Sequence, residues 1–198
     1  MPEKPSYLGL LNAIAVAETR AHEYLNAWIA VTPSAEVAAV LRTVAAREGE
    51  HGMSFAKRLD ELGFQVRWKD DPEGAKRLEI AGATDCSDLE KMKALGLHRL
   101  DTGTKPDIFD KFFEDHSIDI RTGELLGRYI AEERDSGRRL RACYELLEAQ
   151  AKADGSASAE GEGGDRLDVI ETKLDAVCRA VDELRQIVCA QSMPTSAS

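Results

Sequence analysis

Apolar residues recur at steps of three and four along three long stretches of the chain, and this is the spacing of one face of an α-helix. The stretches run from about Ser6 to Val31, from Ser34 to Leu62 and from about Asp119 to Lys152. Pro33 separates the first two stretches and Gly63 follows the second, so both boundaries carry residues that commonly end helices. The pattern predicts an antiparallel hairpin of two helices, followed by a third long helix.

The rest of the sequence has a less regular pattern. Residues 64–118 predict a long crossover with short helical segments at about Leu89–Leu97 and Ile108–Phe113. No strand can be assigned, so the expected fold class is all-α. The expected organisation is a helical domain over residues 1–152, a flexible linker over 153–164, a coiled-coil-like helix over 165–191 and a disordered tail over 192–198.

The segment 165–191 carries apolar side chains at heptad spacing. One core position is taken by Leu167, Leu174, Val181 and Val188, and the other by Ile170, Val177 and Leu184. This pattern is typical of a short coiled coil or a bundle helix, so we expect a homo-oligomer that forms through helical packing. The sequence leaves open whether this helix packs on its own bundle or on a neighbour's.

Three ionisable residues interrupt the apolar faces of the hairpin helices. Glu18 lies in the middle of the first face, and Glu48 and His51 lie in the middle of the second. A charge buried among apolar side chains costs several kcal/mol unless something compensates it. A divalent cation would compensate two carboxylates and an imidazole together, so these residues are candidate metal ligands.

The spacing of these residues about the turn supports their convergence. Glu18 lies 15 residues before Pro33 and Glu48 lies 15 residues after it, which puts both carboxylates at one height on antiparallel helices. His51 shares a helical face with Glu48 because the two are three residues apart. Glu133 interrupts the third apolar face in the same way. Carboxylate oxygens with one imidazole nitrogen suit iron or manganese.

These residues resemble the first half of the di-iron site of the ferritin-like superfamily, especially that of rubrerythrin-like proteins. In that superfamily two helices each give one Glu and two others each give a Glu-x-x-His motif. The similarity covers residues 6–63 and, around Glu133, residues 119–152. It implies a ferritin-like antiparallel bundle with a long crossover.

The resemblance also implies roles for the candidate ligands. By similarity, Glu48 and Glu133 would bridge the metals, while Glu18 and His51 would bind one of them. The implied function is that of a non-haem iron or manganese protein with oxidoreductase chemistry on ferrous iron, oxygen or peroxide. The chain has no paired cysteines for a rubredoxin-type centre, so peroxidase turnover would need an external electron donor.

The second Glu-x-x-His motif is missing from the last predicted helix, because residues 165–191 contain no histidine. Three alternatives follow: the site holds one metal, a second subunit completes it, or it is a remnant that binds nothing. A different function class therefore stays open, that of a non-catalytic helical scaffold or oligomerisation protein with a degenerate metal site.

Other polar residues lie close to the predicted ligands along the helices. His22 follows Glu18 by one turn and Tyr129 precedes Glu133 by one turn, so each is a candidate for a supporting contact with a ligand. Glu132 and Arg134 flank Glu133 and leave open the alternative that Glu133 belongs to a solvated face.

The composition narrows the class of partner. The formal net charge is −10, which argues against non-specific nucleic-acid binding because such binding needs a basic surface.

No apolar run approaches the roughly 18 residues of a membrane span, and the N-terminal residues lack the pattern of a secretory signal. The four cysteines form no C-x-x-C pair. We therefore expect a cytoplasmic protein with free thiols and no membrane partner.

Overall fold

The first two helices form the predicted hairpin. Helix α1 spans Leu8–Ile29 and helix α2 spans Ala35–Glu61. The hydroxyl of Ser34 accepts a hydrogen bond from the backbone N–H of Val37 at 3.2 Å, which satisfies a donor that the first turn of α2 would otherwise leave free. Gly63 follows α2 with a φ of +83°, a backbone conformation that glycine adopts without strain.

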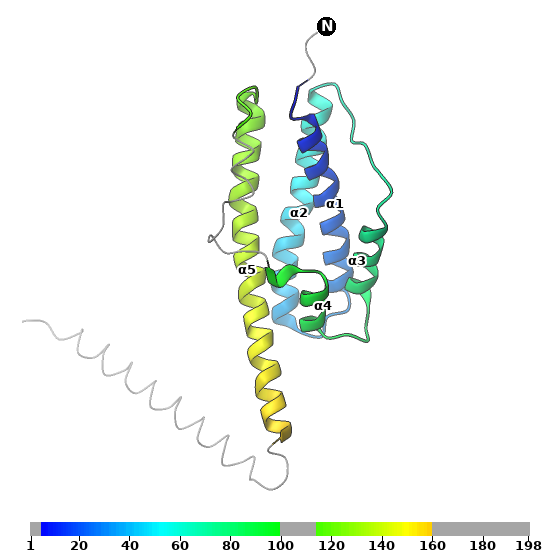
Figure 1. Cartoon of the computed structure of the whole chain (residues 1–198), viewed down its shortest axis with the longest axis vertical. Coiled ribbons are helices and arrows are strands. Elements are labelled where there is room, and N and C mark those ends of the chain that lie inside the picture. Colours follow the sequence, from blue (N-terminus) through cyan, green and yellow to red (C-terminus); the bar gives the residue numbers. More distant parts are fainter. Residues whose placement is uncertain (1–4, 100–113, 160–198) are drawn as a thin grey trace, which may run out of the picture. The chain divides into compact units, whose positions relative to one another are not determined.

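The computed structural model describes residues 5–99 and 114–159 (Figure 1). Within those ranges the remaining elements are α3 (Pro72–Gly82), α4 (Asp88–Ala94), a 3₁₀ turn (Leu97–Arg99) and α5 (Ile120–Ala159). The described residues contain no strand, which confirms the all-α prediction. The predicted segment 108–113 and the predicted helix 165–191 lie outside the described residues.

The chain divides into a unit of residues Met1–Ala151 and a unit of residues Lys152–Ser198. The contacts and the site described below belong to the first unit. No helix in the described part of the chain is both long enough and apolar enough to cross a bilayer.

One helix was not predicted, and another extends further than predicted. Helix α3 was not expected, because its side chains are mostly exposed and only Ala81 is buried; Pro72 begins it in the first-turn position that suits proline. Helix α5 continues past Lys152 to Ala159, into the predicted linker. Alanine is abundant there and the single glycine, Gly155, lowers helix stability by only about 1 kcal/mol, so the helix can continue.

Two glycines bring α1 and α2 into close contact. A Cβ atom at Gly52 would lie 2.6 Å from Thr19 Oγ1, and one at Gly49 would lie 2.7 Å from His22 Nδ1. Real Cβ atoms do not approach so closely, so a side chain at Gly49 would displace the His22 ring and one at Gly52 would also crowd the Thr19 backbone nitrogen, which lies 3.1 Å from that Cβ position. Glu48 adjoins this contact and Glu18 lies opposite it, so the close approach helps to bring their carboxylates together.

Helix α5 runs antiparallel to α2. Arg58 near the end of α2 donates to Thr122 near the start of α5 at 2.9 Å, whereas Arg47 donates to Asp135 further along α5 at 2.7 Å. The same register places the middle of α2 against Glu132 and Glu133 of α5.

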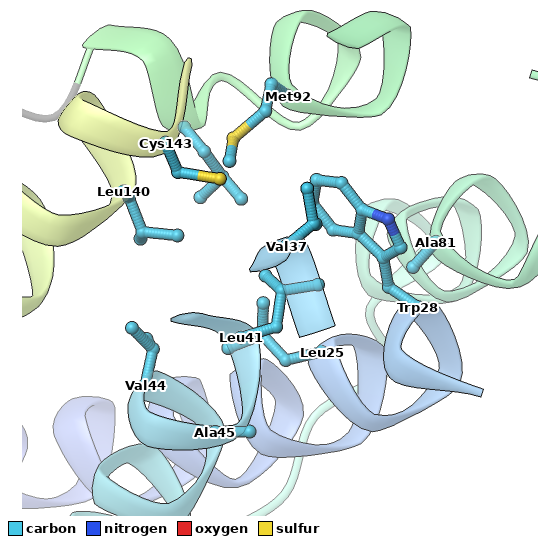
Figure 2. Close-up of a cluster of buried hydrophobic side chains, with 11 residues drawn as sticks. Leu25, Trp28, Val37, Leu41, Val44, Ala45, Ala81, Met92, Leu140 and Cys143 are labelled. Carbon is cyan, nitrogen blue, oxygen red and sulfur yellow. The ribbon is translucent and has the colours of Figure 1, made fainter. Parts of the chain in front are cut away.

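The core consists of two apolar clusters. The first surrounds Trp28 and includes Leu41, Met92 and Leu140 (Figure 2). The second surrounds Phe55. On each of α1, α2 and α5, residues of one cluster precede the predicted ligands and residues of the other cluster follow them. The ionisable side chains therefore occupy a polar layer between two apolar layers.

A buried carboxylate attaches α4 to the end of α1. Asp88 accepts hydrogen bonds at 2.6 Å from the indole Nε1–H of Trp28 and at 2.6 Å from the hydroxyl of Thr32. Trp28 is fully buried and Asp88 is 8% exposed. The carboxylate supplies the acceptor that the buried indole N–H of Trp28 needs, because a buried N–H without an acceptor costs free energy.

We expect Asp88→Ala to lower the free energy of unfolding by about 1–3 kcal/mol, because it leaves the buried indole N–H of Trp28 unsatisfied. Urea denaturation followed by circular dichroism measures the change. Asp85→Ala, at an exposed position three residues earlier, is the matched control and should shift stability by less than about 0.5 kcal/mol. Equal effects of the two substitutions would contradict the proposed role of Asp88.

Candidate metal centre

The structure brings four predicted ligands together. Glu18, Glu48, His51 and Glu133 each offer a ligand atom, and these atoms all lie within 4.8 Å of one another. Glu18, Glu48 and His51 are buried and Glu133 is partly buried. The group combines three carboxylates and one imidazole from α1, α2 and α5, as the positions in the apolar faces predicted.

Three atoms of this group have no hydrogen-bond partner although they are buried. They are Glu18 Oε2, His51 Nδ1 and Glu133 Oε1. His51 Nδ1 lies 3.4 Å from Glu18 Oε2 and 3.6 Å from Glu133 Oε1, so the three atoms face a common point. Buried polar atoms normally find a partner, so this arrangement is typical of a site that accepts a cation.

The other ring nitrogen of His51 is already engaged. Its Nε2 lies 2.7 Å from Oε2 of Glu132, whose second oxygen accepts from Arg128 Nε at 3.0 Å. Arg128 in turn pairs with Glu50 at 3.0 Å. In the neutral imidazole, a carboxylate at Nε2 favours the proton on that nitrogen, which leaves the Nδ1 lone pair for a metal.

Glu132 contacts the site although the sequence did not predict it. Its side chain is 25% exposed and contacts His51 directly. Adjacent residues on a helix point about 100° apart, so Glu132 and Glu133 reach His51 from different sides. Sequence spacing identified Glu133 on the apolar face. It did not reveal that the adjacent Glu132 could reach the imidazole of His51.

Tyr129 contacts the predicted ligands. Its hydroxyl donates to Glu18 Oε1 at 3.0 Å, and its ring centroid lies 5.0 Å from that of His51 in an edge arrangement. Burial, together with the charges of Glu18 and Glu133, raises the pKa of Tyr129, which therefore stays a hydrogen-bond donor. The sequence had predicted a supporting role for Tyr129, and this contact has that geometry.

His22 does not join the four converging side chains. Its Nδ1 lies 2.6 Å from the carbonyl oxygen of Ala45, and its ring packs against Gly49. The imidazole fills the interface between α1 and α2. The His22 ring takes this orientation because α2 approaches closely at Gly49. The spacing of His22 from Glu18 in the sequence could not show this.

The carboxyl groups share protons when no cation is bound. Burial and the contact with Glu18 raise the pKa of Glu48 to about 11. Burial opposes ionisation of Glu18 as well, but the interactions with His51, Glu48 and Tyr129 outweigh it and lower the pKa of Glu18. Burial followed by the charge of Glu18 raises the pKa of Glu133 to about 7. Glu48 therefore holds a proton at neutral pH and can donate it to the Glu18 carboxylate.

A cavity of about 1480 Å³ reaches this group. Its lining includes Glu18, Glu48 and Glu133, while His51 is not among its lining residues. Apolar side chains of α1 form much of the wall, and Arg138 of α5 also borders the cavity. A small molecule could thus approach the carboxylates through this space.

Comparisons of the chain with family models, curated proteins and solved structures gave no match.

We expect Glu48→Gln to stabilise the metal-free protein by about 1–3 kcal/mol at neutral pH. The folded-state pKa of Glu48, about 11, lies above its ordinary value of 4.5, so its contribution to stability is complete below about pH 4.5 and declines as the pH rises. Glutamine keeps a donor toward Glu18 and does not ionise. Urea denaturation in the presence of a chelator, at several pH values, measures the effect.

The advantage of Glu48→Gln should shrink as the pH falls toward 4.5, where Glu48 is protonated in both states. Glu50→Gln, at an exposed position on the same helix, is the control and should leave stability almost unchanged. A Glu48→Gln protein less stable than the native chain at neutral pH would show that the carboxyl is not held in its neutral form.

We expect Glu132→Leu to reduce the fraction of His51 that carries its proton on Nε2, because the acceptor at 2.7 Å is lost. The ¹⁵N chemical shifts of the imidazole, recorded on metal-free protein at alkaline pH, report the tautomer. Glu50→Gln leaves Glu132 in place and should preserve the native shifts. Unchanged shifts in Glu132→Leu would mean that Glu132 does not set the tautomer.

Proposed function

We propose that this protein binds iron or manganese through Glu18, Glu48, His51 and Glu133 and acts as an oxidoreductase. The observation that carries the proposal is the set of three buried, unpartnered atoms that face one point. Three carboxylates and one imidazole form a donor set that suits Fe²⁺ or Mn²⁺. When bound, such a metal supplies one-electron chemistry with oxygen or peroxide, or is itself oxidised as a ferrous substrate.

The side chains around the ligands would prepare them for the metal. Tyr129 holds one oxygen of Glu18 and so turns the other oxygen toward the centre. Glu132 holds Nε2 of His51 and leaves Nδ1 free. A bound cation would replace the proton that the Glu48 carboxyl holds. Metal binding would therefore be coupled to proton release.

The cavity supports a reaction with a small oxidant. It reaches three of the four ligands and is large enough for oxygen or peroxide to approach with water. We further propose that the bundle belongs to the ferritin-like class, that peroxide reduction draws on an external electron donor, and that the protein acts as a homo-oligomer in the cytoplasm. These proposals rest on the ligand pattern and on the heptad pattern of residues 165–191.

We expect anaerobic reconstitution with ferrous iron to load the native chain, and His51→Ala and Glu48→Ala to weaken binding by at least about 100-fold, since each removes a ligand. Calorimetry and elemental analysis measure affinity and content. Glu23→Ala is the control, because Glu23 is an exposed carboxylate of α1 outside the ligand group. A native chain that retains no metal would favour the alternative function, that of a helical scaffold with a degenerate site.

A further inference from the structure

The ligand pattern of α2 has an incomplete counterpart on α5. On α2, Glu48 is followed three residues later by His51, and on α5, Glu133 is followed at the same spacing by Ser136. Residues three apart share a helical face, so Ser136 occupies the position at which a second histidine would extend the centre. Ser136 is 2% exposed, so its hydroxyl points into the protein. A neutral serine is a weak ligand for iron or manganese.

A guanidinium group is bound at this position. Arg47 Nη1 donates to Ser136 Oγ at 3.3 Å and to Asp135 Oδ2 at 2.7 Å. The Arg47 side chain is 24% exposed, so a permanent positive charge lies partly inside the protein. Arg47 directly precedes Glu48 in the sequence, and its hydrogen bond places its charge beside Ser136, one helical turn beyond Glu133.

Asp135 does not cancel this positive charge. The same carboxylate also accepts from Arg139 at 2.7 Å and from Arg138 at 3.3 Å. Three guanidinium groups thus share one carboxylate, and positive charge is in excess at this end of the group.

We propose that the centre binds a single metal ion and that the guanidinium of Arg47, seated on Ser136, occupies the region where a second cation would otherwise lie. One divalent ion and one guanidinium together balance the three carboxylates Glu18, Glu48 and Glu133. The inference rests on the proposed function and defines it more closely, since it assigns the centre to the mononuclear class.

Titration of the chelator-treated full chain with Mn²⁺, followed by electron paramagnetic resonance and elemental analysis, tests the number of ions. We expect the native chain to saturate at a single Mn²⁺ with the spectrum of an isolated ion. The double variant R47Q/S136H removes the guanidinium and supplies an imidazole beside Glu133. It should bind a second Mn²⁺ and show the broadened spectrum of a spin-coupled pair.

The variant R139Q/S136H is the matched control, because Arg139 donates to the same Asp135 while its own side chain is 49% exposed. It keeps Arg47 and should remain at a single ion. A coupled pair in the native chain, or no second ion in folded R47Q/S136H, overturns the inference while the metal function stands. A native chain that binds no Mn²⁺ and no Fe²⁺ overturns the proposed function itself.

Discussion

Charge neutrality inside an apolar helical bundle is the constraint on which this structure depends. Glu18, Glu48 and His51 lie between two apolar clusters, where burial limits the solvation of a net charge. Ionised carboxylates there need protons or a cation as partners. Without a cation, Glu48 is neutral and the Glu18 carboxylate is stabilised by contacts with His51 and Tyr129. A bound divalent ion would replace this proton sharing with coordination.

Helix α5 organises the ligands of the other two helices. It contributes Glu133, holds Glu18 through Tyr129 and holds His51 through Glu132. These three residues span little more than one helical turn. A shift of α5 along α2 would therefore disturb Glu18, His51 and Glu133 together, which ties much of the geometry of the candidate centre to the packing of a single helix.

The sequence was sufficient to predict the hairpin and the convergence of the four ligands. Pro33 and Gly63 mark real boundaries, and buried ionisable residues stand out against a periodic apolar face. It did not predict α3, because that helix has only 11 residues and buries only Ala81, so its apolar face is short. The contact of Glu132 with His51 also required the structure, since it depends on how closely two helices approach rather than on spacing within one of them.

The glycines at positions 49 and 52 have a consequence for the choice of ion. They lie on the face of α2 that touches α1, so the width of that contact limits how far Glu18 stands from Glu48. An added methyl group at position 52 would crowd the backbone of α1 at Thr19 and press the two helices apart. The gap between the donor atoms of the proposed centre would then widen and would favour a cation of larger radius, although no donor had changed. In the proposed centre, selectivity for ionic size would thus depend in part on residues that never touch the ion.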